Sequence, residues 1–207
     1  MSPLALNCGR QQLVVMARWP AAGRCKSRLG AGIGPAAAAG IQRRLSAHTL
    51  AVAQQLGGTE LVLAVSGLGP RGARRWGLSL GAHRAVLQGN GGLGSRMARQ
   101  LARAWREGTQ QVLLIGTDLP LLARGDLEAA LAALASSPLV LGPASDGGYW
   151  LIGLRRPQPS LLSGIPWGSA EVLGRTLERA AALGLEPALL AQRSDLDRPM
   201  DLEPWLG

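Results

Sequence analysis

A basic, glycine-containing segment follows the first apolar run of the sequence and has the composition of a phosphate-binding loop. It reads ARWPAAGRCKSRLG, it includes Gly23, and it holds Lys26, the single lysine of the chain. Glycine lets the backbone approach a phosphate closely, and alternating cations can surround a diphosphate. Because the G-x-x-x-x-G-K spacing is missing, the segment is not a Walker A loop. It indicates another kind of phosphate loop, with a solvated basic surface loop as the alternative. Its cations are Arg18, Arg24, Lys26 and Arg28.

A second glycine-rich segment, QGNGGLGSRM, lies between a predicted strand and a predicted helix. Gly89, Gly91 and Gly94 match the G-x-G-x-x-G fingerprint of dinucleotide-binding proteins, and Asp118 follows the next strand. An NAD-dependent dehydrogenase is therefore one alternative. The unit lies in mid-chain, however, the turn after the first strand lacks the fingerprint, and no base for hydride transfer is evident farther along. A flexible turn without a ligand is the other alternative.

The aspartates are distributed in a way that indicates a divalent metal ion. The chain has six, and all but Asp126, which we expect to cap a helix, lie in loops after predicted strands. Asp118 directly follows a buried apolar strand, and Asp195 and Asp197 lie on one side of an extended chain. Taken singly, Asp118 also fits a turn or a helix cap, and Asp146 fits an Asp-Gly hairpin turn. Gathered carboxylates beside gathered cations favour Mg²⁺ or Mn²⁺ bridging a diphosphate.

The elements that must hold these residues alternate between apolar, β-rich runs and Ala/Leu/Arg-rich runs at helical spacing. This alternation predicts one α/β domain over residues 1–207, with a mostly parallel central sheet flanked by helices. In open sheets of this kind, ligands bind beyond the carboxyl ends of the strands, where the segments above lie. We predict strands at 13–18, 61–66, 84–88, 112–116, 139–141, 149–154 and 187–192, helices at 35–57, 95–107, 127–136 and 169–183, and a short helix within 67–80.

Composition and charge exclude several classes of protein. The 47% of hydrophobic residues exclude a disordered chain, and no run reaches the ~18 apolar residues of a membrane span. A net charge of +9 invites a nucleic-acid interpretation, but the arginines are scattered and phenylalanine is absent. We therefore expect no nucleic-acid partner and a polyanionic small ligand at most. The apolar run at the start is too short for a secretory signal, and two cysteines are too few for a disulfide framework, so we expect a soluble, cytoplasmic protein.

Six motifs, in order along nearly the whole chain, resemble those of one protein family. MARWPAAGRCKSRLG is similar to the family's A-K-x-P-x-x-G-x-x-K-T-R-L, QGNGGLGSRM to Q-G-x-x-L-G-E-R-M, and IGTDLP to I-G-S-D-C-P. LGPASDGGYWLIGL, IPWGSAEVL and DLDRPMDL are similar to L-G-P-A-x-D-G-G-Y-x-L-I-G-L, W-S-T-x-x-V-L and D-I-D-T-P-E-D-L. The chain thus resembles DUF2064, also called radical-SAM/selenodomain-associated transferase 1, whose relatives are nucleotide-diphospho-sugar transferases and 2-phospholactate guanylyltransferase. It departs from the family at Arg18, Ser27, Ser95, Arg198 and Met200.

The resemblance implies a GT-A, Rossmann-like nucleotide-binding fold and assigns roles by position. Asp118, Asp195 and Asp197 would hold a divalent cation, Mg²⁺ or Mn²⁺. Lys26 would act in catalysis as well as in phosphate binding, and Asp146 would act as a base. Gly147, Gly148 and Tyr149 would shape the acceptor side. The residues expected to bind the nucleotide are Ala17, Arg18, Gly23, Arg24, Lys26, Arg28, Leu93, Gly94 and Arg96.

Three functions remain after this comparison of motifs. The leading one is a metal-dependent transferase that moves a sugar from a nucleoside-diphosphate sugar to a small acceptor. The second is a nucleotidyltransferase that joins a nucleoside triphosphate to a phosphorylated acid and releases pyrophosphate. The third is a non-catalytic nucleotide-binding protein. The first two differ in product, because one releases a nucleoside diphosphate and the other pyrophosphate.

Overall fold

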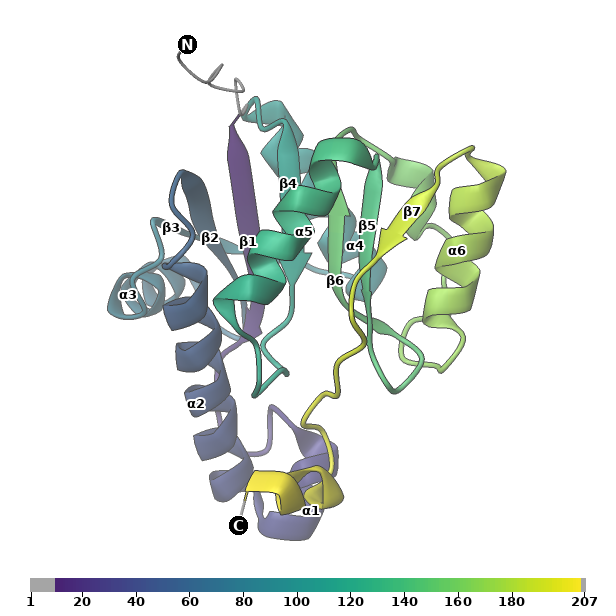
Figure 1. The fold of residues 1–207 in the computed structure, drawn as a ribbon. Helices are drawn as coiled ribbons and strands as arrows, with labels where there is room; N and C mark the ends of the chain where they lie inside the picture. The colour runs from purple at the N-terminus through teal and green to yellow at the C-terminus, as the bar shows by residue number, and fades with distance from the viewer. Residues whose placement is uncertain (1–9, 206–207) are drawn as a thin grey trace.

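The computed structural model describes residues 10–205, and its centre is a sheet of seven strands (Figure 1). The strands run in the order β3-β2-β1-β4-β6-β5-β7. β6 is antiparallel to both of its neighbours, and the other pairs are parallel. The expectation of a mostly parallel sheet flanked by helices is confirmed. The strands are β1 Gln11–Arg18, β2 Thr59–Ser66, β3 Arg84–Leu87, β4 Gln111–Ile115, β5 Leu139–Pro143, β6 Tyr149–Leu154 and β7 Pro187–Leu189.

Helices cover both faces of the sheet, which explains why the central strands are apolar on both sides. Six consecutive residues of β1 are buried, as expected of a parallel strand between two helical layers. One core layer joins the sheet to α2, α3 and α5, and the other joins it to α4, α6 and the 3₁₀ turn η1 (Figure 1). The helices are α2 Pro35–Ala53, α3 Pro70–Ser79, α4 Leu93–Arg106, α5 Arg124–Ser136 and α6 Val172–Ala182, with η1 at Pro159–Leu162.

A small cap lies beyond the carboxyl ends of β1 and β4 (Figure 1). It is formed by α1, Ser27–Ile33, and by the 3₁₀ helix η2, Pro199–Trp205, near the end of the chain. Leu29 of α1 packs with Ala38 of α2 and with Leu196, which precedes η2. Gly32 faces Pro199 so closely that a Cβ there would lie 2.3 Å from the proline Cγ. The segment of Asp195 and Asp197 is thereby held against the segment that follows β1.

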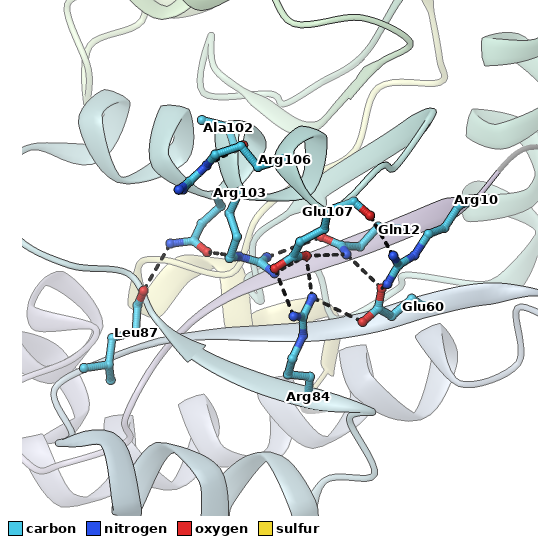
Figure 2. Close-up of polar contacts among 10 residues, drawn as sticks. Arg10, Gln12, Glu60, Arg84, Leu87, Ala102, Arg103, Arg106 and Glu107 are labelled. Carbon is cyan, nitrogen blue, oxygen red and sulfur yellow. Dashed lines mark hydrogen bonds and ion pairs between the residues drawn. The ribbon is translucent and has the colours of Figure 1, made fainter.

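The opposite, amino edge of the sheet carries a cluster of paired charges (Figure 2). Arg84 donates two hydrogen bonds to the Glu107 carboxylate, at 2.9 and 2.6 Å, and Arg103 contacts the same group at 3.2 Å. Glu60 receives Arg10 at 2.8 Å and Arg84 at 3.2 Å. Burial alone would raise the pKa of Glu107, but the hydrogen bonds from Arg84 and the charge of Arg103 outweigh it and lower the pKa. The carboxylates of Glu60 and Glu107 therefore each have several hydrogen-bonding or ion-pair partners.

Several sequence-based predictions differ from the structure in detail. The helix expected over 35–57 ends at Ala53, and the strand expected over 187–192 ends at Leu189. Residues 27–33 form a short helix where we expected only a loop, because Leu29 provides an apolar contact that packs against α2. The helix expected to begin at Ser169 begins at Val172. Asp126 caps α5 from within its first turn and not from the position before it, since it is the third residue of the helix and its carboxylate accepts a hydrogen bond from the Ala123 amide at 3.0 Å. Among the described residues, no helix is long and apolar enough to cross a membrane.

Candidate functional site

A cavity of about 600 Å³ opens at the carboxyl edge of the sheet. Its lining comes from the segments that follow β1 and β4, the turn between β5 and β6, the first turn of α4, the loop before α6 and the segment before η2. These segments are far apart in the sequence and meet because parallel strands end at the same edge. The predicted site residues that line it are Arg18, Lys26, Arg28, Leu93, Arg96, Asp118, Asp146, Gly148, Tyr149, Asp195 and Asp197.

Lys26 is buried at the centre of the polar part of this cavity. Its side chain is only 3% exposed, and its ammonium group donates to the Asp118 carboxylate and to the Leu196 carbonyl. Lys26 is also the one non-glycine residue with a positive φ, 48°, among the described residues. Left-handed backbone costs a non-glycine residue about 1 kcal/mol or more, and such strain is typical of functional sites. The backbone therefore holds the ammonium group toward the cavity at some cost in stability.

The segment of Asp195 and Asp197 is attached to the loop after β4 and to α1. The Leu196 amide donates to the Asp118 carbonyl at 2.9 Å, and the Leu196 carbonyl accepts from Lys26. Arg28 pairs with the Asp197 carboxylate at 3.0 Å. Asp201 accepts hydrogen bonds from the Asp197 and Arg198 amides at 2.9 and 2.7 Å, which gives this aspartate a structural role. Residues separated by nearly the whole chain thus form one unit.

Asp195 has more negative charge around it than its neighbours neutralise. The pKa of its carboxyl group is raised to about 7, first by burial and then by the charges of Asp118 and Asp146, with Lys26 acting in the opposite direction. A divalent cation would relieve this repulsion, and carboxylate oxygens are the ligands that Mg²⁺ and Mn²⁺ prefer. Within residues 10–202, however, no three acidic, histidine or cysteine side chains already form a metal centre. The carboxylate oxygens are suitable ligands for the cation, but Lys26 and Arg28 pair with two of the three carboxylates, those of Asp118 and Asp197.

Five predicted residues stand outside the cavity lining. Ala17 is fully buried in β1, and Gly94 is covered by Trp167, so that a Cβ on Gly94 would lie 2.3 Å from the indole Nε1. Gly147 has φ 88° and packs on Ala170, at whose carbonyl oxygen a Cβ would lie 2.2 Å away. These three shape the site from behind. The remaining two are Gly23, with φ 71° in the turn after β1, and Arg24, whose carbonyl accepts a hydrogen bond from Arg18 at 3.0 Å.

Several lining residues were not predicted to bind. Gln88 is 5% exposed, and its amide nitrogen donates to the Ala17 and Ala64 carbonyls at 3.1 and 3.0 Å, which turns its oxygen toward Arg96. Gln42 on α2 donates to the Thr117 hydroxyl at 2.9 Å behind Asp118. The QG pair at the start of the second glycine-rich motif was a signal for Gln88. Nothing local in α2 indicates that Gln42 reaches the site.

The acceptor side that we predicted contains an aromatic pair. Tyr149 and Trp167 meet edge to face, with ring centroids 6.1 Å apart and planes at 80°. Burial raises the pKa of the Tyr149 hydroxyl, so this group stays neutral. The Asp146 carboxylate accepts a hydrogen bond from the Gly148 amide at 2.9 Å. Because the turn places Asp146 and Tyr149 together on the cavity, the structure brings these two predicted residues to one wall.

The family assignment follows from the match of this chain to known proteins. A family model described as an uncharacterized protein conserved in bacteria, DUF2064, matches residues 49–169, which is more than half of the chain. The chain belongs to the DUF2064 family. A crystal structure of a presumed nucleotide-diphospho-sugar transferase from Desulfovibrio desulfuricans G20 is similar to this DUF2064 protein, with 30% identity and a TM-score of 0.86. The similarity covers 93% of this chain and 84% of that one. The fold is that of nucleotide-diphospho-sugar transferases, as the motifs implied.

More distant structures share the fold alone. Glucosyl-3-phosphoglycerate synthase from Mycobacterium tuberculosis, crystallised with Mn²⁺, UDP and glucosyl-3-phosphoglycerate, has 16% identity and a TM-score of 0.58 over 93% of this chain and 74% of that one.

A part of the chain is also similar in sequence to a nucleotidyltransferase. A 3-phospho-D-glycerate guanylyltransferase from Phenylobacterium zucineum (strain HLK1) is 39% identical over 94 residues. That alignment covers 44% of this chain and 41% of the relative, so the chain spans about two fifths of its length. The proteins similar to this DUF2064 chain in fold or in sequence therefore bear the names of both sugar and nucleotidyl transferases.

Proposed function

We propose that this DUF2064 protein is a metal-dependent glycosyltransferase that moves a sugar from a nucleoside-diphosphate sugar to a small acceptor. The observation that carries the proposal is the meeting of cations and carboxylates at the carboxyl edge of the sheet, where Lys26 contacts Asp118 and Arg28 contacts Asp197. An anionic diphosphate and a divalent cation would each satisfy one half of this arrangement. The 30% identity with the Desulfovibrio protein over almost the whole chain supports the same donor class.

The residues of the chain divide the work according to their charge. Asp118, Asp195 and Asp197 would hold the cation, which when bound neutralises charge on the departing diphosphate. Binding there would replace Lys26 as the counter-charge of Asp118, and the ammonium group would then face the phosphates together with Arg18 and Arg28. The side chains of Arg18, Lys26 and Arg28 all line the cavity.

Transfer itself requires a hydroxyl of the acceptor to approach from the side of Asp146. The acceptor oxygen forms a bond to the anomeric carbon as the bond from that carbon to the diphosphate breaks, and the nucleoside diphosphate leaves with the electron pair. The hydroxyl proton passes to the Asp146 carboxylate, one oxygen of which accepts a hydrogen bond from the Gly148 amide at 2.9 Å. Asp146 lines the same cavity as the cations, so donor and acceptor share one space.

A thermal-shift panel of the purified protein tests the proposal. It pairs nucleoside triphosphates and common nucleoside-diphosphate sugars with Mg²⁺, Mn²⁺ or EDTA. A ligand at 100 times its Kd should add about 2.7 kcal/mol of stability, which is easily measured. We expect stabilisation by one nucleoside-diphosphate sugar that depends on the metal, and release of the nucleoside diphosphate once an acceptor is added. Absence of stabilisation by every nucleotide would contradict any nucleotide-dependent transfer.

Nucleotidyl transfer is the second candidate, and the similarity to the guanylyltransferase supports it. In that case a nucleoside triphosphate would stabilise the protein and pyrophosphate would be the product. A coupled pyrophosphate assay on the same samples therefore distinguishes the two reactions. Stabilisation without either product would favour a nucleotide-binding protein that does not catalyse transfer.

A further inference from the structure

One wall of the cavity is built by two segments that dock on each other. They are the turn between β5 and β6 and the loop before α6, and the Leu173 amide donates to the Gly147 carbonyl at 2.9 Å. Gly147 has φ 88° and lies so close to Ala170 that no side chain fits between the segments. Six of the residues that this surface presents to the cavity are here called the acceptor wall: Asp146, Gly148, Tyr149, Trp167, Gly168 and Ser169.

The aromatic rings of the acceptor wall are held in place from behind. Tyr149 and Trp167 pack edge to face, and the Trp167 indole rests on Gly94 at the start of α4, where a Cβ would lie 2.3 Å from Nε1. A ring with so little freedom pays little conformational entropy when a ligand packs on it. Fixed aromatic faces beside a few polar groups are typical of pockets that bind ring-shaped organic molecules.

The acceptor wall has no positive side chain. Residues 144–150 and 165–172 contain no lysine, arginine or histidine, and their acidic members are Asp146 and Glu171. The cations of the cavity lie on other elements. Arg18 ends β1, Lys26 and Arg28 pair with carboxylates at α1, and Arg96 on α4 donates to Gln88 at 3.3 Å. A phosphate or carboxylate placed on this wall would lie beside the Asp146 carboxylate, and neither segment supplies a counter-charge to offset the repulsion.

We propose that the acceptor wall binds a neutral, polyhydroxylated molecule, a carbohydrate or another polyol, and discriminates against phosphorylated and carboxylated acceptors. The inference rests on the proposed function, since it names the acceptor class of that same site. The Asp146 oxygen that the Gly148 amide does not engage accepts hydrogen bonds from hydroxyl groups, which are stronger than bonds to a neutral acceptor atom because the carboxylate is charged. The Trp167 and Tyr149 rings cover the apolar face of the ligand.

Matched pairs of ligands that differ only in a phosphate group test the charge preference. Isothermal titration on the protein saturated with Mg²⁺ and a nucleoside diphosphate would compare D-glucose with D-glucose 6-phosphate, D-ribose with D-ribose 5-phosphate, and glycerol with glycerol 3-phosphate, with 3-phospho-D-glycerate as a further anionic probe. We expect a neutral member to bind about tenfold more tightly than its phosphorylated partner. Tighter binding of the phosphorylated members, or no binding of any neutral one, overturns the inference.

Variants connect the preference to the acceptor wall. Asp146→Asn should weaken the neutral ligand about tenfold and strengthen the phosphorylated one, because the same charge attracts hydroxyls and repels phosphates. Glu171→Gln is the matched control, since Glu171 is an acid of the same loop whose exposed side chain pairs with Arg175 instead. Trp167→Phe should retain more affinity for the neutral ligand than Trp167→Ala. An unchanged preference in Asp146→Asn would contradict the assignment.

The nucleotide titration in the same samples separates this inference from the function beneath it. Intact nucleotide binding with a preference for phosphorylated acceptors would overturn the acceptor class and leave the nucleotide-dependent transferase standing. Binding of the neutral ligand without any nucleotide binding would support the acceptor wall and contradict the proposed function.

Discussion

The two edges of the same sheet carry the same kinds of charged residue in opposite balance. At the amino edge, Arg10, Arg84 and Arg103 surround Glu60 and Glu107, and every carboxylate has several donors (Figure 2). At the carboxyl edge, repulsion from neighbouring carboxylates adds to burial in raising the pKa of Asp195 to about 7. The carboxylates of the amino edge are therefore neutralised by their own arginine neighbours. The carboxylates of the carboxyl edge need an added positive charge to offset their repulsion. This difference separates a charge cluster that supports the fold from one that prepares a site for a ligand.

The largest expected effect comes from Asp118, which we place at the centre of the incomplete edge. Asp118→Ala should weaken metal-dependent nucleotide binding at least about 100-fold, because it removes a metal ligand and leaves Lys26 without its carboxylate. Titration calorimetry with and without EDTA measures the loss, and circular dichroism checks the fold. Asp118→Asn is the matched control for the hydrogen bond to Lys26. Wild-type affinity in Asp118→Ala would remove the distinction between the two edges.

Replacing a carboxylate of the amino edge by alanine should lower the stability of the fold and leave nucleotide binding unchanged. Glu107→Ala should lower the free energy of unfolding by about 2 kcal/mol, since three partly buried cationic and amide groups lose their acceptor. Glu128→Ala, which breaks an exposed pair with Arg124, should change it by less than about 0.5 kcal/mol. Urea unfolding measures both values. A Glu107→Ala protein of normal stability with reduced nucleotide affinity would reverse the roles assigned to the edges.

A smaller and more selective loss is expected at Lys26. Lys26→Ala should weaken a nucleoside diphosphate about tenfold and a nucleoside hardly at all, because the ammonium group acts on phosphate charge. Arg24→Ala is the matched control, since its side chain is exposed and lies outside the cavity lining. Competition binding with nucleoside, monophosphate and diphosphate measures the trend. Equal losses for all three would place Lys26 away from the phosphates.

The smallest effect concerns pH and belongs to the amino edge. Burial would raise the pKa of Glu60, but hydrogen bonds from Gln12 and Arg10 outweigh it and lower the pKa below the ordinary 4.5. The pKa of Glu107 is lowered too, so both groups stabilise the fold above pH 4.5 and lose this contribution as pH falls through their folded-state values. The stability difference between wild type and Glu107→Gln should therefore shrink below pH 4.5 in urea titrations. A stability difference between these two proteins that grows on acidification would mean that the pKa of Glu107 is raised in the folded protein, and would contradict this prediction.

Local pattern was enough to predict most elements and the chemistry at their ends. Apolar, β-rich runs predicted β6 with its observed bounds and placed β1, β2 and β4 within two residues at each end. The loops after β1, β4, β5 and β7 were predicted to hold the cations and carboxylates because ligands bind at the carboxyl ends of strands. Helix starts were less accurate at α5 and α6, by three residues each, and in α5 the first three residues, Arg124–Asp126, include no apolar residue to mark the start.

The sequence by itself determined the fold class, the family motifs and the charged residues that face the cavity. Only the tertiary structure decided their partners: Lys26 with Asp118, 92 residues apart, Arg28 with Asp197, 169 residues apart, and the Trp167 ring on Gly94. Periodicity reports which residues are buried and does not report what they are buried against. The order β4-β6-β5 and the docking of η2 on α1 depend on such long-range contacts. That packing brings acid to base at the carboxyl edge and leaves the acceptor wall without a cation.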